Sequence, residues 1–291
     1  MKASAECLAC VAAHAYDVIK KSGIRSEEEL FNYYKKILSY TLQKTSWGDK
    51  PIEISKYVYD YLEEIFGDKD FYENEKTNSN QMLIEMYDDL YEYSRSSEDP
   101  IYAALKLSAV ANLIDYGVKN SFGELEFEIE SLSKNREFTI DDYELFTKKL
   151  ENTETLLFIH DNAGEIVLDK VLIKIIKDNY PNIVIYSALR SSPVINDATL
   201  RDAEEIYLKE VSIPIESGSK YPGTLLESVG TSFMSIYNKA NLVISKGQGN
   251  FEGLEGSSDK VFFILMAKCK TIASYLNIQV GDIIFKKDSL K

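Results

Sequence analysis

Hydrophobic and polar positions follow two different periods along this chain, and the pattern changes near residue 150. In the first half, apolar residues recur at steps of three and four, which is typical of helices that bury one face. In the second half, short continuous apolar runs alternate with helical patterns, which predicts parallel strands with helices on both sides of the sheet. We therefore expect an α/β fold that combines an N-terminal helical region over residues 1–140 with an α/β domain over residues 150–291.

Local signals mark where several helices of the first half begin and end. Ser26 followed by Glu29 is a capping-box pattern, which predicts a helix that continues to Leu42. Pro51 fits the first position of the next helix, and Gly67 fits its end. Three more helices are expected over residues 6–21, 81–93 and 100–116, and the polar stretches 67–80 and 117–138 are expected to be loops.

Residues 155–174 show the change from strand to helix most clearly. The apolar residues 156–159 predict a buried strand, and helical spacing resumes after the polar turn Asp161-Asn162-Ala163-Gly164. Further strands are expected at residues 183–189, 241–245, 261–267 and 282–285. Polar clusters follow three of the strands, at Asp161-Asn162, at residues 190–197 and at residues 246–250. Because the carboxyl ends of parallel strands share one edge of the sheet, we expect the three clusters to form one pocket.

The side chains at this edge indicate a metal and a phosphate. Asp161, Asn162 and Asp197 offer only oxygen ligands, which suit Mg²⁺ or Mn²⁺ better than zinc. Lys246 adds a positive charge, and the glycines after it would let backbone amides approach a phosphate. Each turn also has a simpler explanation, because Asp can cap a helix and because Asn, Asp and Gly are common in tight turns. The prediction of a metal and phosphate site therefore depends on the expected convergence of all three turns, and not on any single turn.

Composition narrows the range of partners and locations. The 33 basic and 47 acidic residues give a net charge of −14, which disfavours nucleic acid or an anionic membrane as the main partner. A small anionic ligand would need a bound metal and a few local Lys or Arg residues. No apolar run reaches membrane-spanning length and the first residues lack a signal-peptide core, so we expect a cytoplasmic protein. The oligomeric state is not indicated.

Three cysteines are too few for a disulfide framework, but two of them share a helix face with a histidine. Cys7, Cys10 and His14 recur at helical spacing, and Cys269 would join them if the fold brings the two ends of the chain together. Such a set could hold zinc. Small apolar packing explains the same pattern. Cys7 and Cys10 are therefore candidates either for a second metal site or for a structural cluster.

Three motifs in order resemble those of the metal-dependent damage-control phosphatases, and more narrowly of their cysteine-containing microbial branch. They are Asp161-Asn162-Ala163-Gly164-Glu165, PVINDAT at residues 193–199 and KGQGNFE at residues 246–252. The resemblance covers nearly the whole chain and extends to Cys7-x-x-Cys10, Asn112-x-x-Asp115 and Lys268-Cys269. The chain departs from the family pattern at Ala111, where a glycine is expected before Asn112.

The resemblance implies a mainly parallel, Rossmann-like sheet in a catalytic domain over residues 150–291, with the active site in the cleft beside the helical region. It implies a divalent metal, namely Mn²⁺, Mg²⁺, Co²⁺ or Ni²⁺, held by Asp161, Asn162 and Asp197. Lys246 would contact the phosphate of a small phosphorylated metabolite. The expected substrate-binding residues, including two from the loop after Lys246, are Glu165, Arg190, Asn196, Gly247, Gln248, Asn112 and Asp115.

The hypothesis from these observations is metal-assisted hydrolysis of sugar phosphates, nucleotides or damaged phosphometabolites. Attack by water is favoured over attack by Asp161, because a carboxylate bound to metal is a weak nucleophile. Two alternatives remain open. An S-adenosylmethionine-dependent methyltransferase could use a sheet with acidic strand ends, and it would not need a divalent metal. A non-catalytic metal-binding or ligand-binding protein would bind metal without releasing phosphate.

Overall fold

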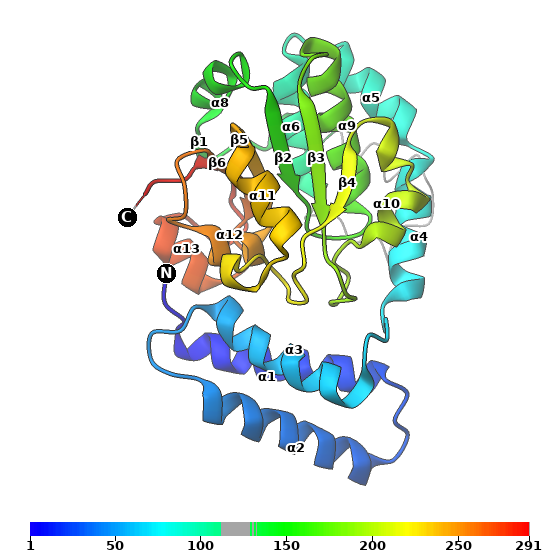
Figure 1. The fold of residues 1–291 in the computed structure, drawn as a ribbon, viewed down its shortest axis with the longest axis vertical. Coiled ribbons are helices and arrows are strands. Elements are labelled where there is room, and N and C mark those ends of the chain that lie inside the picture. Colours follow the sequence, from blue (N-terminus) through cyan, green and yellow to red (C-terminus); the bar gives the residue numbers. More distant parts are fainter. Residues whose placement is uncertain (112–128, 130, 132, 291) are drawn as a thin grey trace.

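The computed structural model of the protein describes residues 1–111, 129, 131 and 133–290. Within these residues a seven-stranded sheet has the order β1-β7-β6-β5-β2-β3-β4 (Figure 1). Every neighbouring pair is parallel except β6 and β7. The prediction of a mainly parallel, Rossmann-like sheet is confirmed. The strands are β1 (Ile140–Asp141), β2 (Thr155–Ile159), β3 (Val184–Leu189), β4 (Ile213–Glu216), β5 (Leu242–Lys246), β6 (Val261–Met266) and β7 (Ile283–Lys287).

Alternate residues of the central strand β2 face opposite sides of the sheet. Leu156 and Phe158 pack into one hydrophobic core, and Leu157 and Ile159 pack into the other. The first core is covered by α4 (Glu73–Ile84), α5 (Tyr87–Arg95), α6 (Pro100–Val110), α8 (Tyr143–Leu150), α9 (Glu165–Asn179) and α10 (Leu200–Glu205). The second is covered by α11 (Thr231–Lys239), α12 (Gln248–Leu254) and α13 (Lys270–Leu276). The 3₁₀ turns η2 (Leu208–Glu210) and η3 (Leu226–Ser228) lie in connections between these elements.

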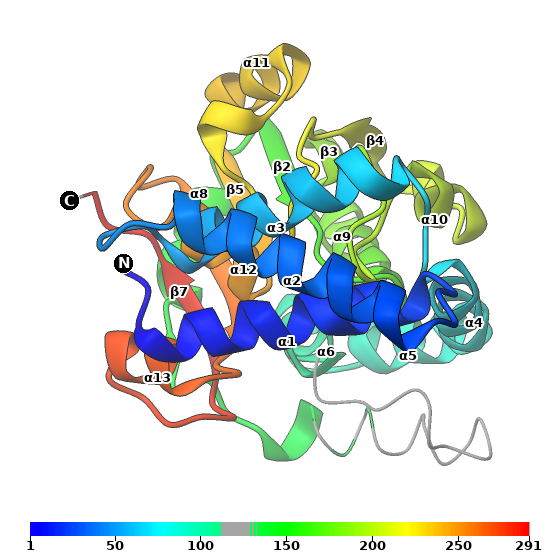
Figure 2. The ribbon, with the colours of Figure 1, turned by 90° about the horizontal axis from the view of Figure 1, so that it is seen from below.

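The first three helices form a layer of their own. They are α1 (Ala5–Lys21), α2 (Glu27–Lys44) and α3 (Pro51–Phe66), and they enclose a separate core. Figures 1 and 2 show this layer lying across the end of the sheet toward which β2 and β3 run. The Glu29 amide donates to the Ser26 hydroxyl at 3.3 Å, and Pro51 is the first residue of α3, so both predicted helix starts are confirmed.

Helices α5 and α6 belong to the sheet rather than to this layer. Both pack on α9, and their buried residues share one core with Leu156 and Phe158. The described part of residues 1–140 therefore contributes buried side chains to two different cores. The expected division of the chain near residues 140–150, with the active site in a cleft between the two regions, stays a prediction.

The loop predicted over residues 67–80 is wrong from Glu73 onward, because α4 begins there. The helix predicted over residues 81–93 is in fact the end of α4 and most of α5, separated at Glu85 and Met86. The buried side of α4 includes Lys76 and Asn80. Because polar side chains fill most of the buried face of α4, its apolar residues show no helical period, and hydrophobic patterning could not reveal the helix.

Candidate active site

Three polar clusters meet where three adjacent strands end, as the parallel arrangement predicts. In the sheet, β2 lies between β3 and β5, with Ile159 of β2 level with Ala188 of β3 and Ser245 of β5. The chain leaves β2 for β3 on one side and later returns to β5 on the other. In open α/β sheets, ligands bind at such a switch point, outside the carboxyl ends of the strands.

Backbone hydrogen bonds join the turn after β2 to the loop after β3. The Ala163 amide donates to the Asn196 carbonyl and the Ala198 amide donates to the Asp161 carbonyl, both at 2.8 Å. Asn162 and Asp197 form an antiparallel β-bridge between these bonds. Residues 35 positions apart in sequence are thus fixed side by side, and the candidate ligands Asp161, Asn162 and Asp197 are brought together.

Arg190 anchors the two carboxylates from inside the protein. Its Nε donates to Oδ2 of Asp197 at 2.6 Å, and one of its terminal nitrogens lies 3.8 Å from Oδ1 of Asp161. The same guanidinium donates to Thr224 at 3.3 Å and to Asn250 at 3.1 Å. All three guanidinium nitrogens have protein partners and the side chain is buried. Its contacts are those of an anchor for carboxylates, and the substrate-binding role expected for it stays a prediction.

The site holds more buried carboxyl groups than nearby cations can neutralise. Burial raises the pKa of Asp197 to about 7, against the influence of Arg190, and Asp161 adds to the increase. Burial likewise raises the pKa of Glu165 to about 7, where Lys246 opposes the shift and Asp161 adds to it. The pKa of Asp161 itself is raised by burial, although Lys268 and Arg190 oppose the change. A bound cation would offset the repulsion between these groups.

The donor set at these turns fits a hard divalent cation. The Asn162 amide nitrogen donates to Asp161 at 3.2 Å and to Glu165 at 2.8 Å, which fixes the orientation of the side chain. Arg190 contacts Oδ2 of Asp197, so Oδ1 is the oxygen that this contact does not use. Within the described residues no group of three or more His, Cys, Asp or Glu side chains is arranged to hold a metal. The expected set of two carboxylates and one amide, all oxygen donors, is of the kind that Mg²⁺ and Mn²⁺ accept with several waters.

Lys246 is the centre of a buried network that the sequence did not suggest. Its Nζ donates to Oδ1 of Asp169 at 2.6 Å and to the Ser108 carbonyl at 2.9 Å, and it lies 3.7 Å from Oε2 of Glu165. Asp169 also accepts from the Ser108 hydroxyl at 2.6 Å and interacts with Nδ1 of His160 at 2.9 Å. A carboxylate among the apolar residues of α9 was the one available sequence signal for Asp169.

The protonation state of each ionisable side chain in this network depends on burial and on its neighbours. Burial lowers the pKa of His160, so its ring is neutral and donates from Nδ1 to Asp169. Burial would raise the pKa of Asp169, but Lys246 and His160 outweigh it and the pKa is lowered. Burial would lower the pKa of Lys246, but Asp169 and Glu165 outweigh it and the pKa is raised. Lys246 is therefore a buried, charged ammonium beside Glu165.

Gly247 follows β5 at the point of closest approach to Asp161. Its φ is +83°, and a Cβ atom there would lie 2.0 Å from Oδ2 of Asp161. Only glycine fits both the backbone conformation and the space. The Gly247 amide donates to the Ile264 carbonyl at 2.9 Å, so it belongs to the sheet. Gly249 has a packing role, because a Cβ atom there would lie 1.8 Å from the Pro222 carbonyl oxygen.

Gln248 connects the site to a carboxyl group with no role in the sequence hypothesis. Its Nε2 donates to Glu252 at 3.0 Å and contacts the Cys269 sulfur at 3.6 Å. Burial raises the pKa of Glu252 to about 7, a hydrogen bond from Gln248 opposes the shift, and Asp161 adds to it. Glu252 is the last residue of the motif KGQGNFE at residues 246–252, and that motif was the sequence signal that could have identified it.

Other expected residues are placed less directly. The Asn196 side chain is exposed, and the bond that links it to the site comes from its backbone carbonyl. Asn112 and Asp115 lie outside the described residues, so their roles stay predictions. The substrate-binding roles of Glu165, Gly247 and Gln248 stay predictions as well, although all three lie within the group of contacts around Asp161.

The three cysteines lie near one another beside Gln248 and Glu252 of α12. Cys7 is buried and its sulfur lies 3.8 Å from the Thr271 hydroxyl, so the two ends of the chain do meet. Burial raises the pKa of Cys10, and Cys269 and Cys7 add to the increase. All three thiols are free. His14 is directed elsewhere, with Nε2 2.7 Å from the Tyr59 hydroxyl. A structural cluster accounts for these contacts, and metal binding by Cys7 and Cys10 stays a prediction.

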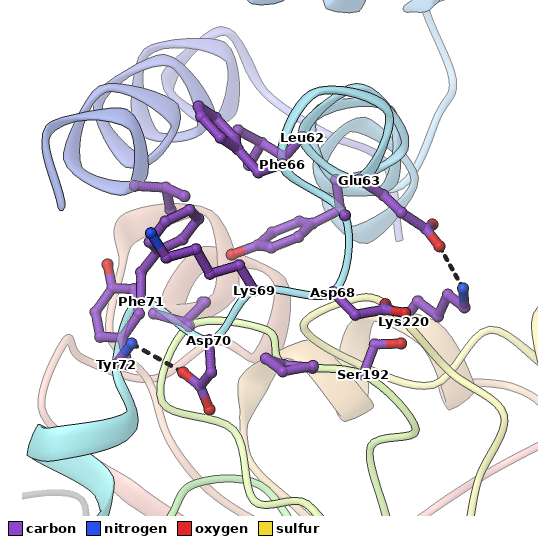
Figure 3. Close-up of a pocket in the computed structure, with 15 residues that line it drawn as sticks. Leu62, Glu63, Phe66, Asp68, Lys69, Asp70, Phe71, Tyr72, Ser192 and Lys220 are labelled. Carbon is purple, nitrogen blue, oxygen red and sulfur yellow. Dashed lines mark hydrogen bonds and ion pairs between the residues drawn. The ribbon is translucent and has the colours of Figure 1, made fainter. Parts of the chain in front are cut away.

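A pocket lies beside the loop that carries Asp197, between the end of α3 and residues 192–195 (Figure 3). Its walls come from segments far apart in sequence, so no motif indicated it. Aromatic rings of Tyr59, Phe66, Phe71 and Tyr72 line much of it. Burial raises the pKa of Tyr59 well above its ordinary value, and Asp197 adds to the increase, so the carboxylate cluster is close by.

Comparisons with known proteins place the chain in a family and show a similar fold. A family model described as the damage-control phosphatase ARMT1-like domain matches residues 3–284. The chain is 30% identical over 294 residues to a damage-control phosphatase of Pyrococcus horikoshii, with 100% of both chains covered. It is 28% identical over 292 residues to a damage-control phosphatase of Archaeoglobus fulgidus, covering 98% of this chain and 99% of the other. The crystal structure of a DUF89 family protein from Pyrococcus horikoshii is similar with a TM-score of 0.91 and 29% identity, over 99% of this chain and 100% of that chain.

Proposed function

The chain belongs to the damage-control phosphatase ARMT1-like family, and we propose that it hydrolyses small phosphate monoesters with a divalent cation held by Asp161, Asn162 and Asp197. The observation that supports this most is the β-bridge between Asn162 and Asp197, which places two buried carboxylates and an amide at the switch point of the sheet. Candidate cations are Mn²⁺, Mg²⁺, Co²⁺ and Ni²⁺. When bound, the cation would supply positive charge for phosphoryl oxygens and would acidify water.

Lys246 supplies a fixed positive charge at the end of β5. Asp169 and the Ser108 carbonyl hold its ammonium group, so the charge is oriented before a ligand arrives. Such preorganised charge stabilises negative charge that develops on a phosphate during hydrolysis. Oε2 of Glu165 lies 3.7 Å from Nζ of Lys246. In this proposal Glu165 lies between the Lys246 ammonium group and the phosphate.

Glu165 is the group best suited to move a proton. Its pKa is raised to about 7, mainly by burial, so near neutral pH it is balanced between the protonated and ionised forms. Asn162 donates to Oε1 at 2.8 Å, so Oε2 is the oxygen directed toward Lys246. We propose that Glu165 accepts a proton from the attacking water or returns one to the leaving group.

The rest of the substrate would lie toward the helical layer. We propose that it occupies the pocket lined by Tyr59, Tyr72 and Ser192, beside the loop that carries Asp197 (Figure 3). Its rings could hold a sugar or a base, with Lys69 and Lys220 at its rim. Small phosphorylated metabolites, including sugar phosphates, nucleotides and damaged phosphometabolites, are the proposed substrates.

Family membership supports this function over the methyltransferase and the non-catalytic binding protein. A nucleic-acid partner stays disfavoured by the net charge of −14, and a cytoplasmic location stays a prediction. As for membranes, none of the helices in the described part of the chain has both the length and the apolar character needed to span one.

The test is release of inorganic phosphate from a panel of sugar phosphates and nucleotides. Each substrate is assayed with Mg²⁺, Mn²⁺, Co²⁺ or Ni²⁺ and again with excess chelator, using the wild type, Asp161→Ala and Asp197→Ala. Asp259→Ala, at an exposed carboxylate, is the control. We expect metal-dependent release that both site variants abolish and the control retains. Release that persists in chelator would overturn the proposed mechanism.

A further inference from the structure

A buried polar cluster connects α4 with α10, beside the turns that carry the candidate metal ligands. Its central side chains are Lys76, Asn80 and Asp202, with exposed fractions of 3%, 1% and 2%. Figure 1 shows α4 and α10 side by side at one edge of the molecule. Buried polar groups are costly unless each has a partner, so a network of this kind fixes the geometry of the segments that it joins.

Asn80 reaches from this cluster to the turn after β2. Its Oδ1 accepts a hydrogen bond from the Gly164 amide at 2.7 Å. Gly164 has a φ of +78°, and a Cβ atom there would lie 2.9 Å from Cβ of Ser79, so the backbone of α4 rests directly on the turn. Gly164 is two residues from Asn162 and three from Asp161. Asn80 therefore holds one side of the candidate metal site.

Asp202 reaches from the same cluster to the loop after β3. Its Oδ2 accepts from the Thr199 amide at 2.8 Å and from the Thr199 hydroxyl at 2.7 Å. Thr199 is two residues from Asp197 and lies beside Arg190 in a β-bridge. Asp202 therefore holds the other side of the candidate metal site.

The two sides are joined by Asn80 itself. Its Nδ2 donates to Oδ1 of Asp202 at 3.0 Å and to Oε2 of Glu205 at 2.9 Å. Lys76 lies 3.1 Å from Asp202 and 2.8 Å from Asp70, and it offsets the charge of both carboxylates. The result is a continuous chain of hydrogen bonds that runs from Gly164 through Asn80 and Asp202 to Thr199.

We propose that Asn80 and Asp202 are positioning residues that hold the turn after β2 and the loop after β3 at the separation required by the divalent cation. The inference rests on the proposed function, because it concerns the same metal. It assigns to α4, a helix without an apolar period, the task of supporting the site from outside. Groups that orient metal ligands in this way commonly change metal affinity by about 10- to 100-fold when they are removed.

An amide is required at position 80 because it accepts from Gly164 and donates to Asp202 and Glu205 at once. In Asn80→Asp, the donor is lost and a third carboxylate faces two others. Asp202→Asn keeps the shape of the side chain but removes the charge that Lys76 offsets. Combining both substitutions reverses the donor and the acceptor of the Asn80–Asp202 bond and restores the total charge. Glu205 would still face the carboxylate introduced at position 80, so recovery is expected to be partial.

The experiment measures Mn²⁺ affinity by isothermal titration calorimetry without any substrate. The proteins are the wild type, Asp161→Ala, Asn80→Ala, Asn80→Asp, Asp202→Asn and the double variant Asn80→Asp/Asp202→Asn. Thr77→Ala is the matched control, because Thr77 contacts Glu205 from the same helix, at 3.1 Å. Thermal unfolding of the metal-free proteins is recorded in parallel.

We expect Asn80→Ala and Asn80→Asp to weaken Mn²⁺ binding about 10-fold or more, and the double variant to bind more tightly than Asn80→Asp. Thr77→Ala is expected to bind as the wild type does. Folded Asn80 and Asp202 variants that keep wild-type affinity would overturn the inference, even if their melting temperatures fall. If Asn80→Asp does not fold, the Mn²⁺ affinities of Asn80→Ala and Thr77→Ala are compared, and equal affinities would overturn the inference. Failure of the proposed function is distinguishable, because then the wild type and Asp161→Ala would bind Mn²⁺ alike.

Discussion

Nζ of Lys246 lies 2.6 Å from Oδ1 of Asp169, and both side chains are buried. The pair places a fixed cation at the end of β5 and a fixed anion on α9, next to the turns that carry Asp161 and Asp197. Breaking one partner of a buried ion pair leaves an uncompensated charge, whereas removing both charges together is often nearly neutral for stability. The role of Lys246 in catalysis can therefore be separated from its role in the fold.

We predict that Lys246→Met lowers the free energy of unfolding by about 3–5 kcal/mol, because Asp169 is left without its cation. Phosphate release should also fall, by about 100- to 1,000-fold, if the ammonium stabilises developing charge. The double variant Lys246→Met/Asp169→Asn should regain most of the stability but none of the activity. Urea unfolding and phosphate release on the same preparations check both parts. A double variant no more stable than Lys246→Met would refute the pairing as the source of stability.

Gly247→Ala should disturb the candidate metal site itself. The added Cβ would fall 2.0 Å from Oδ2 of Asp161, so the carboxylate must move. Gly23→Ala is the matched control, because Gly23 has a φ of +84° and no atom within 4 Å of its added Cβ. Both variants carry a backbone cost for a positive φ, of order 1–3 kcal/mol, and only Gly247→Ala should lose Mn²⁺ binding in a calorimetric titration. Equal Mn²⁺ affinity in the two variants would show that Gly247 does not shape the site.

Stability without metal should fall as the pH rises from about 5 to 8. In the fold, burial raises the pKa of Glu165, Asp197 and Glu252 to about 7. Unfolded carboxyl groups titrate near pH 4, so between about pH 4 and 8 the folded chain holds more protons than the unfolded chain. Stability then decreases with increasing pH across this window.

The check is the melting temperature of chelator-treated protein at pH 6 and pH 8, with and without Mn²⁺. We expect a lower value at pH 8, and a larger rise on adding Mn²⁺ at pH 8, where the carboxylates are ionised. Asp197→Asn should flatten the pH dependence of the metal-free protein. A melting temperature that increases from pH 6 to pH 8 without metal would show that burial does not raise the pKa of these carboxyl groups.

The sequence specified the elements that follow a hydrophobic period, and it missed those that do not. The apolar runs before Asp161, Arg190 and Lys246 correspond to β2, β3 and β5, and parallel pairing placed the three polar clusters at one edge. Strand β4 was missed because it lies at the sheet edge, is incompletely buried and contains Pro214. Helix α4 was missed because its buried face is partly polar.

The unpredicted parts of the site depend on tertiary contacts. Asp169 meets Lys246 across 77 positions of sequence, and Asn80 meets Gly164 across 84. No local spacing records such a meeting. Two kinds of sequence signal were available. One is a charged residue inside an apolar helix face, as at Asp169. The other is a pair of polar residues at helical spacing without apolar neighbours, as at Lys76 and Asn80.

The proposed metal site is tested most directly by the number of Mn²⁺ ions bound per chain, determined from the electron paramagnetic resonance signal of free Mn²⁺ during titration. The proteins are the wild type, Asp161→Asn/Asp197→Asn and the exposed control Asp259→Asn, each shown to be folded by circular dichroism. We expect one tightly bound Mn²⁺ in the wild type and the control, and none in the site variant. The same number of tightly bound ions in all three proteins would contradict it.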